Sequence, residues 1–478
     1  MFFVITFQLA NFGCRASQAD GMALKRQLVE AGFREAADGD ESDIAVLNTC
    51  TVTATADAEV RQVIRRIHRR NPRCRILVTG CYAQRAPEEI AALEGVAWVV
   101  GNSHKHRVIE VLEAEGMPAW GEAAASGDKA RFGSFASSEA PNLHLPPPPV
   151  WPELGQTEGD PKPGRVVVGE IAPEFHFAPA IPDDRTRPTL KVQDGCNARC
   201  SFCIIPAVRG PSRSLAPGAV VKEVRRLERR GYREVVLSGI NLGSYGRDLG
   251  RSIDFVGLLQ RLLSETAIAR IRISSIEPMD ITPELIHLAK GEERVAEHFH
   301  VPLQSGSDRI LRLMNRRYWA GQYAERIVAI RDALPHAGIG ADVMVGFPEE
   351  TDHDHALTAE LIERLPFTYL HIFPFSARPG TPAAFRSGQV GGRVKRERAR
   401  DLQSLISQKR QVFLSAQIGR TLSVLTLDGG SATDRTALSS NYLKVTLPSP
   451  SPPPNVLVDI EVARVCDGML YGFPRRCV

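Results

Sequence analysis

The chain carries little excess charge and has no long apolar run. Lys and Arg exceed Asp and Glu by only four over 478 residues, so composition alone does not require a nucleic-acid partner. The first ten residues, MFFVITFQLA, are apolar but carry no basic segment and are too short to span a membrane. We therefore predict no membrane association and a cytoplasmic location, and we expect these residues to start a strand.

Cysteine is also scarce, yet three of the nine cysteines fall in one short run, KVQDGCNARCSFCIIPAVRG. Cys196, Cys200 and Cys203 are separated by three and two residues, a clustering that suits three irons of a 4Fe–4S cluster and leaves the fourth iron open. A zinc knuckle is the alternative, but it needs a fourth ligand, and the next histidine is His287. A disulfide framework does not suit a long chain without secretory features.

Three more cysteines each follow an apolar, β-branched run. Cys14 follows VITFQLANFG, Cys50 follows DIAVLNT and Cys81 follows RILVTG. If helices at 20–32 and 57–70 are crossovers, the strands are parallel and their carboxyl ends share one edge of the sheet. The sequence therefore predicts a second iron–sulfur site there, with three unrelated core cysteines as the alternative.

The remaining cysteines are not expected to be ligands. Cys74 begins the strand that ends at Cys81, roughly 23 Å away at about 3.3 Å per residue. Cys466 and Cys477 are isolated near the carboxyl terminus and are interpreted as packing or surface thiols.

Composition divides the chain into four parts. Residues 1–108 alternate strands and helices, and 109–186 are rich in Ala, Ser, Gly and Pro and are expected to form a linker or insertion. Residues 187–411 contain six expected strand–helix units, which predict a partly closed parallel (βα)6 barrel. Residues 412–478 are expected to form a small antiparallel barrel of a kind that binds RNA.

The loops after the six barrel strands share one face, where such barrels bind ligands. The expected strands are 189–193, 234–238, 270–276, 298–303, 340–345 and 368–373. Besides the cysteines, this face offers glycines for close approach and polar groups for an amino acid or a ribose. The candidate cofactor-binding residues are Phe202, Gly239, Asn241, Glu277, Gln304, Ser305 and Gly346.

Two stretches are strongly basic. EVRQVIRRIHRRNPRCR and GGRVKRERARDLQSLISQKR could contact a phosphate backbone or could simply be solvated helix faces.

These parts, in this order, resemble the methylthiotransferase family of radical S-adenosylmethionine enzymes. The resemblance covers nearly the whole chain except about 117–188. It implies that Cys196, Cys200 and Cys203 hold the catalytic radical 4Fe–4S cluster, and that Cys14, Cys50 and Cys81 hold an auxiliary 4Fe–4S cluster. It also implies that S-adenosylmethionine is cleaved to a 5′-deoxyadenosyl radical, that a methylthio group enters a C–H bond, and that the last domain is a TRAM domain.

Finer motifs suggest the subtype. LSGINLGSYG, RISSIEP, HVPLQSGSDRIL and HIFPFSARPGTPAA look like the MtaB-type branch, which modifies carbon 2 of N6-threonylcarbamoyl-adenosine next to the tRNA anticodon. The alternatives are isopentenyl-adenosine in tRNA and an aspartate of a ribosomal protein. The implied partners are the tRNA anticodon loop, a flavodoxin- or ferredoxin-type low-potential electron donor and a sulfur donor. One departure is Ser17, where the family usually has Asn.

Overall fold

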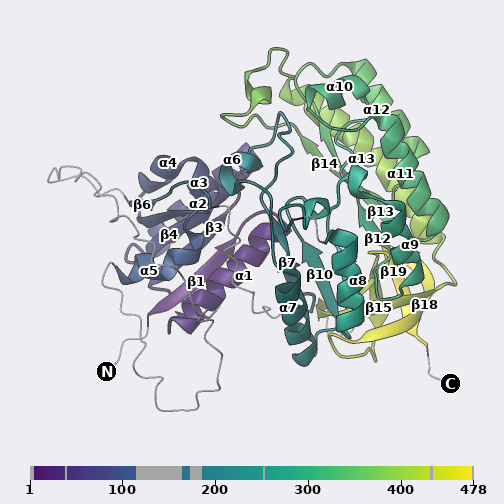
Figure 1. The fold of residues 1–478 in the computed structure, drawn as a ribbon, viewed down its shortest axis with the longest axis horizontal. Helices are drawn as coiled ribbons and strands as arrows, with labels where there is room; N and C mark the ends of the chain where they lie inside the picture. The colour runs from purple at the N-terminus through teal and green to yellow at the C-terminus, as the bar shows by residue number, and fades with distance from the viewer. Residues whose placement is uncertain are drawn as a thin grey trace.

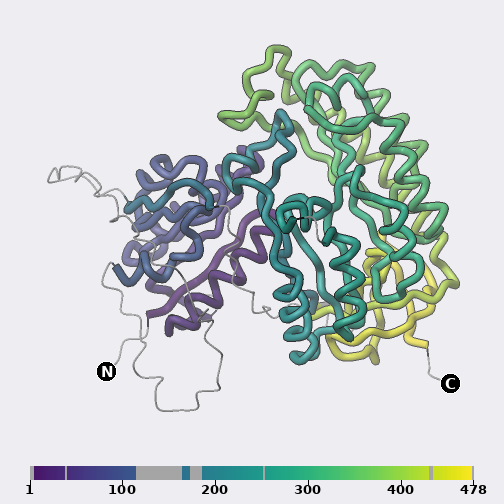
Figure 2. The backbone as a smooth tube through the Cα atoms, in the orientation of Figure 1, coloured from purple at the N-terminus to yellow at the C-terminus, as the bar shows by residue number. Residues whose placement is uncertain are grey.

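The computed structural model describes residues 5–37, 40–114, 164–172, 186–250, 253–430 and 434–475. Three bodies follow one another along the chain (Figure 1). An amino-terminal α/β domain lies on one side of a larger barrel of strands and helices. A small β-barrel at the carboxyl terminus packs beneath the larger barrel, and the backbone trace shows the same arrangement (Figure 2).

The amino-terminal domain is built on a six-stranded parallel sheet in the order β2-β1-β3-β4-β5-β6. Its strands are β1 (Thr6–Asn11), β2 (Arg34–Glu35), β3 (Ile44–Thr49), β4 (Arg75–Gly80), β5 (Val96–Gly101) and β6 (Arg165–Val167). Its helices are α1 (Arg15–Glu30), α2 (Ala54–Arg70), α3 (Cys81–Arg85), α4 (Pro87–Ala91), η1 (Lys105–Arg107) and α5 (Val108–Glu113). β6 lies within residues 109–186, which were expected to form a linker or insertion. This short piece of that segment therefore adds the last strand to the sheet.

The sequence explains why this sheet forms. Every residue of β3, IAVLNT, is buried, and β4 is buried over all but its first residue. Strands covered by helices on both faces need such continuous apolar runs. The strands expected before Cys50 and Cys81 are thus present, and both cysteines directly follow a strand.

The central body has the six parallel strands expected of a partial barrel. They are β7 (Thr189–Lys191), β10 (Glu234–Ser238), β11 (Arg270–Ile273), β12 (His298–His300), β13 (Gly338–Val345) and β14 (Tyr369–Pro374). They form the sheets β11-β10-β7 and β12-β13-β14, which two parallel bridges connect, Ile271 to Val295 and Ser275 to His300. The predicted parallel α/β sheet domain and partial (βα)6 barrel are therefore confirmed.

Helices surround the barrel. They are α7 (Pro217–Arg229), α8 (Phe255–Glu265), α9 (Pro283–Gly291), α10 (Asp308–Leu313), α11 (Ala320–Ala333), α12 (Asp352–Arg364) and α13 (Gly392–Ser415). Alternate strand residues, such as Phe299, Ala341 and Leu370, pack with helix residues in the main hydrophobic core. The residues between them therefore face the inside of the barrel.

The carboxyl-terminal body is a closed five-stranded barrel in the order β15-β16-β17-β19-β18. Its strands are β15 (Thr421–Gly430), β16 (Asp434–Ser439), β17 (Lys444–Pro448), β18 (Leu457–Cys466) and β19 (Met469–Pro474). Arg272 of β11 donates hydrogen bonds to the carbonyl oxygens of Ser439 (3.0 Å) and Ser440 (2.9 Å). The ring of Tyr442 stacks on His298 with centroids 4.3 Å apart. This small barrel thus closes the amino-terminal end of the large one.

Among the described residues, no helix is both long enough and apolar enough to cross a membrane.

Candidate functional site

The loop after β7 carries the first cysteine triad. A two-stranded ribbon, β8 (Gln193–Asp194) with β9 (Arg213–Ser214), brackets this loop, and the short helix α6 (Ile205–Arg209) follows Cys203. The amide of Gln193 donates to the carbonyl of Gly195 (2.8 Å) and accepts from the backbone N–H of Asn241 (2.8 Å). One side chain therefore links the cysteine loop to the loop after β10.

A second set of contacts fixes the other side of this loop. Ser201 donates its backbone N–H to Met314 (3.0 Å) and its hydroxyl to Leu313 (2.8 Å). Arg316 donates to the sulfur of Cys200 at 3.4 Å and pairs with Glu277. Sequence reasoning missed Arg316, because a single arginine carries no motif.

The second triad converges at the carboxyl edge of the amino-terminal sheet, as the parallel topology predicts. Gly13, at φ +97°, lets the loops meet, because a Cβ built on it would lie 2.7 Å from the sulfur of Cys50. Burial raises the pKa of the Cys50 thiol to about 12, and the nearby Cys81 and Cys14 thiols add to this rise. The three thiols thus interact electrostatically although they come from three separate loops.

The spacing of the sulfurs bears on which metal group the triads can hold. Within the described ranges, neither triad has its three sulfurs all within 4.8 Å of one another. One zinc ion with sulfur at about 2.3 Å in a tetrahedron needs sulfurs about 3.8 Å apart. All six cysteines are free thiols. Thiols at this spacing, with no fourth ligand grouped with them among the described residues, fit a larger iron–sulfur cluster better than a single zinc ion.

The two triads are neighbours. Cys81 packs with Ile204, which directly follows Cys203, and with Val208 of α6. Asn102 donates both to the sulfur of Cys81 (3.4 Å) and to the carbonyl of Val208 (2.8 Å). The short helix α6, which directly follows Cys203, therefore contacts Cys81.

A buried charge network lies at the same junction. Arg209, 2% exposed, donates to Asp20 of α1 (3.0 Å) and to Asp194 (3.0 Å), while Lys105 reaches Asp20 at 3.1 Å. Burial acts to lower the pKa of Arg209, but the neighbouring Cys81, Asp194, Asp20 and Cys14 outweigh it and hold this pKa well above its usual value. A permanent cation thus stands beside the second triad, where it can stabilise an anionic cluster.

A cavity of about 380 Å³ opens beside Cys200, within the usual range for small-molecule sites. The predicted residues Asn241 and Glu277 line it, together with Arg316 and Tyr318. Asn241 also approaches the sulfur of Cys196 at 3.9 Å. A polar ligand in this cavity would therefore contact the first triad directly.

The other predicted cofactor contacts lie elsewhere, and each has a structural setting. Phe202 packs against the apolar cluster of Met314, Phe347 and Phe375. Gly239 lies against Gln193, and Gly346 against Lys395 of α13.

The two remaining candidates for cofactor binding, Gln304 and Ser305, lie in the loop after β12. Gln304, at φ +66°, is buried, and its Oε1 has no partner among the described residues. Ser305 is fully buried beside Thr358.

Cys74 is buried at the opposite end of β4 from Cys81. Its sulfur lies 3.8 Å from the hydroxyl oxygen of Ser42. This agrees with its expected separation from the triads. Cys466 is free, and Cys477 lies outside the described residues.

Comparison with known proteins agrees with these two cysteine-bearing domains. Residues 6–101 match the uncharacterized protein family UPF0004, and residues 190–362 match the Radical SAM superfamily. The chain is 37% identical over 438 residues to the threonylcarbamoyladenosine tRNA methylthiotransferase MtaB of Aquifex aeolicus, covering 91% of this chain and 95% of the relative. The chain belongs to the radical S-adenosylmethionine methylthiotransferase family.

Other methylthiotransferases are nearly as similar. The MtaB of Bacillus subtilis is 36% identical, covering 92% of this chain and 90% of the relative. The tRNA-2-methylthio-N(6)-dimethylallyladenosine synthase of Pelotomaculum thermopropionicum is 33% identical, covering 88% and 86%. Sequence similarity thus establishes the family. It separates the two kinds of modified adenosine named for these relatives by only a few per cent of identity.

A solved structure supports the fold. The radical S-adenosylmethionine methyltransferase TsrM of Kitasatospora setae superposes with a TM-score of 0.52 at 13% identity, covering 80% of this chain and 77% of that one. At this identity the likeness concerns the fold alone.

Proposed function

We propose that this methylthiotransferase inserts a methylthio group at carbon 2 of N6-threonylcarbamoyl-adenosine, next to the anticodon of tRNA. The observation that carries the proposal is the approach of the two cysteine triads, since Cys81 packs on the helix that follows Cys203. A sulfur-bearing site and a radical-forming site must both reach one carbon, and α6 contacts both triads here. The similarity to the threonylcarbamoyladenosine tRNA methylthiotransferases of Aquifex aeolicus and Bacillus subtilis supports this substrate.

Each triad has a proposed role. Cys196, Cys200 and Cys203 would hold the radical cluster, and Cys14, Cys50 and Cys81 would hold the auxiliary one. When bound, the two 4Fe–4S clusters supply the electron that cleaves S-adenosylmethionine and the sulfur that is transferred. A flavodoxin- or ferredoxin-type reductant and a separate sulfur donor complete the proposed partners.

The other residues bind and orient. Glu277, with Asn241, would bind the polar groups of S-adenosylmethionine in the cavity beside Cys200. Arg316 would orient Glu277 and donate to Cys200. Arg209 would offset negative charge beside Cys81 and Cys14.

The carboxyl-terminal barrel is proposed to be a TRAM domain that binds RNA. Arg464 stacks over Tyr471, with the guanidinium carbon 4.6 Å from the ring centroid, and Phe473 is 57% exposed on the same strand as Tyr471. Cations and exposed aromatic rings together suit single-stranded RNA, whose bases stack on such rings.

Nucleoside analysis tests the proposal. The chain is expressed in a strain that lacks its own methylthiotransferases, and the tRNA is digested to nucleosides for mass spectrometry. We expect the methylthio form of threonylcarbamoyl-adenosine, and no such product from Cys50→Ala. Methylthio-isopentenyl-adenosine without the threonylcarbamoyl product would overturn the substrate but leave the chemistry intact, and unmodified tRNA would overturn both.

A further inference from the structure

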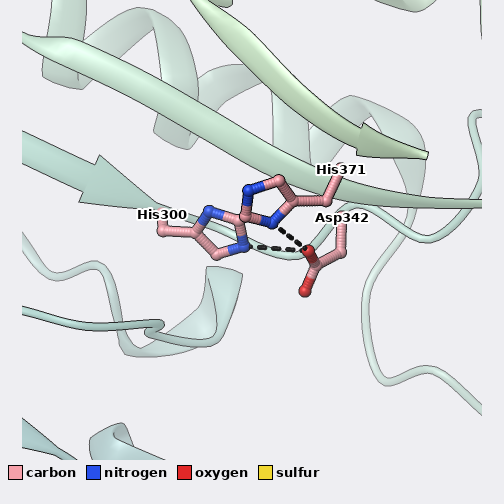
Figure 3. Close-up of side chains that lie close together, drawn as sticks. All are labelled: His300, Asp342 and His371. Carbon is pink, nitrogen blue, oxygen red and sulfur yellow. Dashed lines mark hydrogen bonds and ion pairs between the residues drawn. The ribbon is translucent and has the colours of Figure 1, made fainter. Parts of the chain in front are cut away.

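Three ligand-type side chains meet on the inner face of the barrel (Figure 3). His300 lies on β12, Asp342 on β13 and His371 on β14, and their ligand atoms are all within 4.8 Å of one another. Neighbouring residues such as Ala341 and Leu370 pack outward against the helices, so this cluster faces inward. None of the cofactor contacts proposed above uses it.

Hydrogen bonds arrange the cluster in two layers. The Oδ1 of Asp342 lies 3.1 Å from Nε2 of His300 and 3.2 Å from Nδ1 of His371. The other ring nitrogen of His300 lies 3.0 Å from the hydroxyl of Tyr369, which also contacts His298 at 2.8 Å. Tyr369 therefore holds His300, and through it Asp342, from the amino-terminal end of the barrel strands. At that end Tyr442 stacks on His298 and closes the barrel.

His371 is the accessible member of the cluster. Its side chain is 63% exposed on β14, an edge strand, whereas that of His300 is only 7% exposed. With Nδ1 directed at Asp342, Nε2 of His371 has no hydrogen-bond partner in the part of the chain that the structure describes. The outer edge of this ring is therefore open to a ligand.

The charge of Asp342 orders the cluster. Burial acts to raise the pKa of Asp342, but the hydrogen bonds from His300 and His371 outweigh it and hold this pKa well below its usual range. An ionised carboxylate fixes the orientation of a neighbouring imidazole. Two residues further along the strands, on the same face, Met344 and Phe373 pair, and the partly buried ring of Phe373 offers an apolar contact for a base.

We propose that His371, held by Asp342 and His300, binds the carboxylate-bearing substituent on N6 of the target adenosine and selects it over an apolar substituent. The inference rests on the proposed function and deepens it, because it assigns the residue that recognises the modified base. A polar oxygen of this substituent pairs with the outer nitrogen of the His371 ring, while Asp342 keeps the ring in place. An isopentenyl group would leave that nitrogen unpaired, and burying an unpaired polar group costs binding free energy.

A metal ion is the competing occupant, since two histidines and a carboxylate can bind one. Two observations favour the substrate group. The three side chains already satisfy one another by hydrogen bonds at 3.1 and 3.2 Å. The outermost of them, His371, is largely exposed rather than enclosed by further ligands.

Binding measured without turnover tests the inference. The reconstituted full-length protein, without S-adenosylmethionine, is titrated with anticodon stem-loops that carry threonylcarbamoyl-adenosine, isopentenyl-adenosine or unmodified adenosine. We expect the wild type to bind the threonylcarbamoyl form about tenfold or more tightly than the unmodified form, as a hydrogen bond to a charged group allows. His371→Leu should remove this preference and leave binding of the unmodified stem-loop unchanged.

The controls separate the possible outcomes. His353→Leu, at an exposed histidine of α12, should keep the wild-type preference. If the wild type prefers the threonylcarbamoyl form and His371→Leu keeps that preference, the inference fails while the proposed function stands. If the wild type shows no preference and makes no methylthio-threonylcarbamoyl product, the proposed function fails as well. A zinc or cobalt ion bound stoichiometrically by the wild type and lost in His371→Leu would show that the cluster is a metal site and overturn the inference.

Discussion

Arg209 connects the two cysteine-bearing domains through buried charges. It pairs with Asp20 from the amino-terminal domain and with Asp194 from the barrel, and Lys191 pairs with both carboxylates as well. Removing one partner of such a buried network leaves charges without compensation, which costs far more than an exposed ion pair contributes.

Arg209→Met should therefore destabilise the protein by about 3–5 kcal/mol, because Asp20 and Asp194 lose a common cation. Denaturant unfolding of the reconstituted protein measures this change. Arg65→Met, at an exposed arginine of α2, is the matched control and should be within about 0.5 kcal/mol of the wild type. An unchanged midpoint for Arg209→Met would mean that the network does not hold the two domains together.

Cys50 and Cys74 are both buried thiols of the amino-terminal domain, yet only Cys50 faces the other two cysteines of its triad. Wild-type protein and Cys74→Ala should each hold about eight irons per chain after reconstitution, as two clusters of four. Cys50→Ala should hold about four and still release 5′-deoxyadenosine. Iron and sulfide analysis measures this, and about four irons in the wild type would contradict the two-cluster arrangement.

At the scale of elements, the sequence predicted the strands and cysteine positions well, because apolar runs and parallel topology depend on local pattern. It could not predict that Arg209 meets Asp20, or that His371 meets Asp342. The first contact depends on how two domains dock, and the second depends on strand register inside the barrel. β6 was missed because its three residues come from within a segment rich in Ala, Ser, Gly and Pro.

The two basic stretches differ in how far their charged side chains are exposed. In α13, Arg398 is buried and pairs with Glu350 at 2.6 Å, and Lys395 donates to the carbonyl of Phe375 at 2.8 Å. Part of this stretch therefore holds the helix against the barrel. In α2, Arg65, Arg66, Arg69 and Arg70 are exposed.

The outer face of β18 and β19 is the element that should bind RNA bases. Phe473→Ala combined with Arg464→Gln should weaken tRNA binding by about tenfold or more, since each stacked base contributes about 1–3 kcal/mol. Arg393→Gln, at an arginine 83% exposed on α13, is the charge-matched control. Affinity is measured by titration at several salt concentrations, and an unchanged affinity in the double variant would place RNA binding on another surface.

For the whole molecule, the carboxyl-terminal barrel is part of the catalytic body rather than an appendage. Arg270 donates to the hydroxyl (2.8 Å) and the carbonyl (3.1 Å) of Ser423, while Arg272 donates to Ser439 and Ser440. Both arginines also pair with Glu234, which is fully buried. The charged residues at the closed end of the large barrel thus depend on hydrogen-bond acceptors from the small one.

Truncation after residue 411 should therefore do more than weaken RNA binding. It removes four hydrogen bonds to buried guanidinium groups, each worth about 1.5–3 kcal/mol, and exposes the ring of His298 that Tyr442 covers. The melting temperature of the remaining barrel should fall by about 5 °C or more. Calorimetry of the truncated chain beside the Phe473→Ala and Arg464→Gln double variant separates the two effects, because the double variant should lose tRNA affinity at an unchanged melting temperature. A truncated chain that melts with the wild type would show that the large barrel does not need the small one to close it.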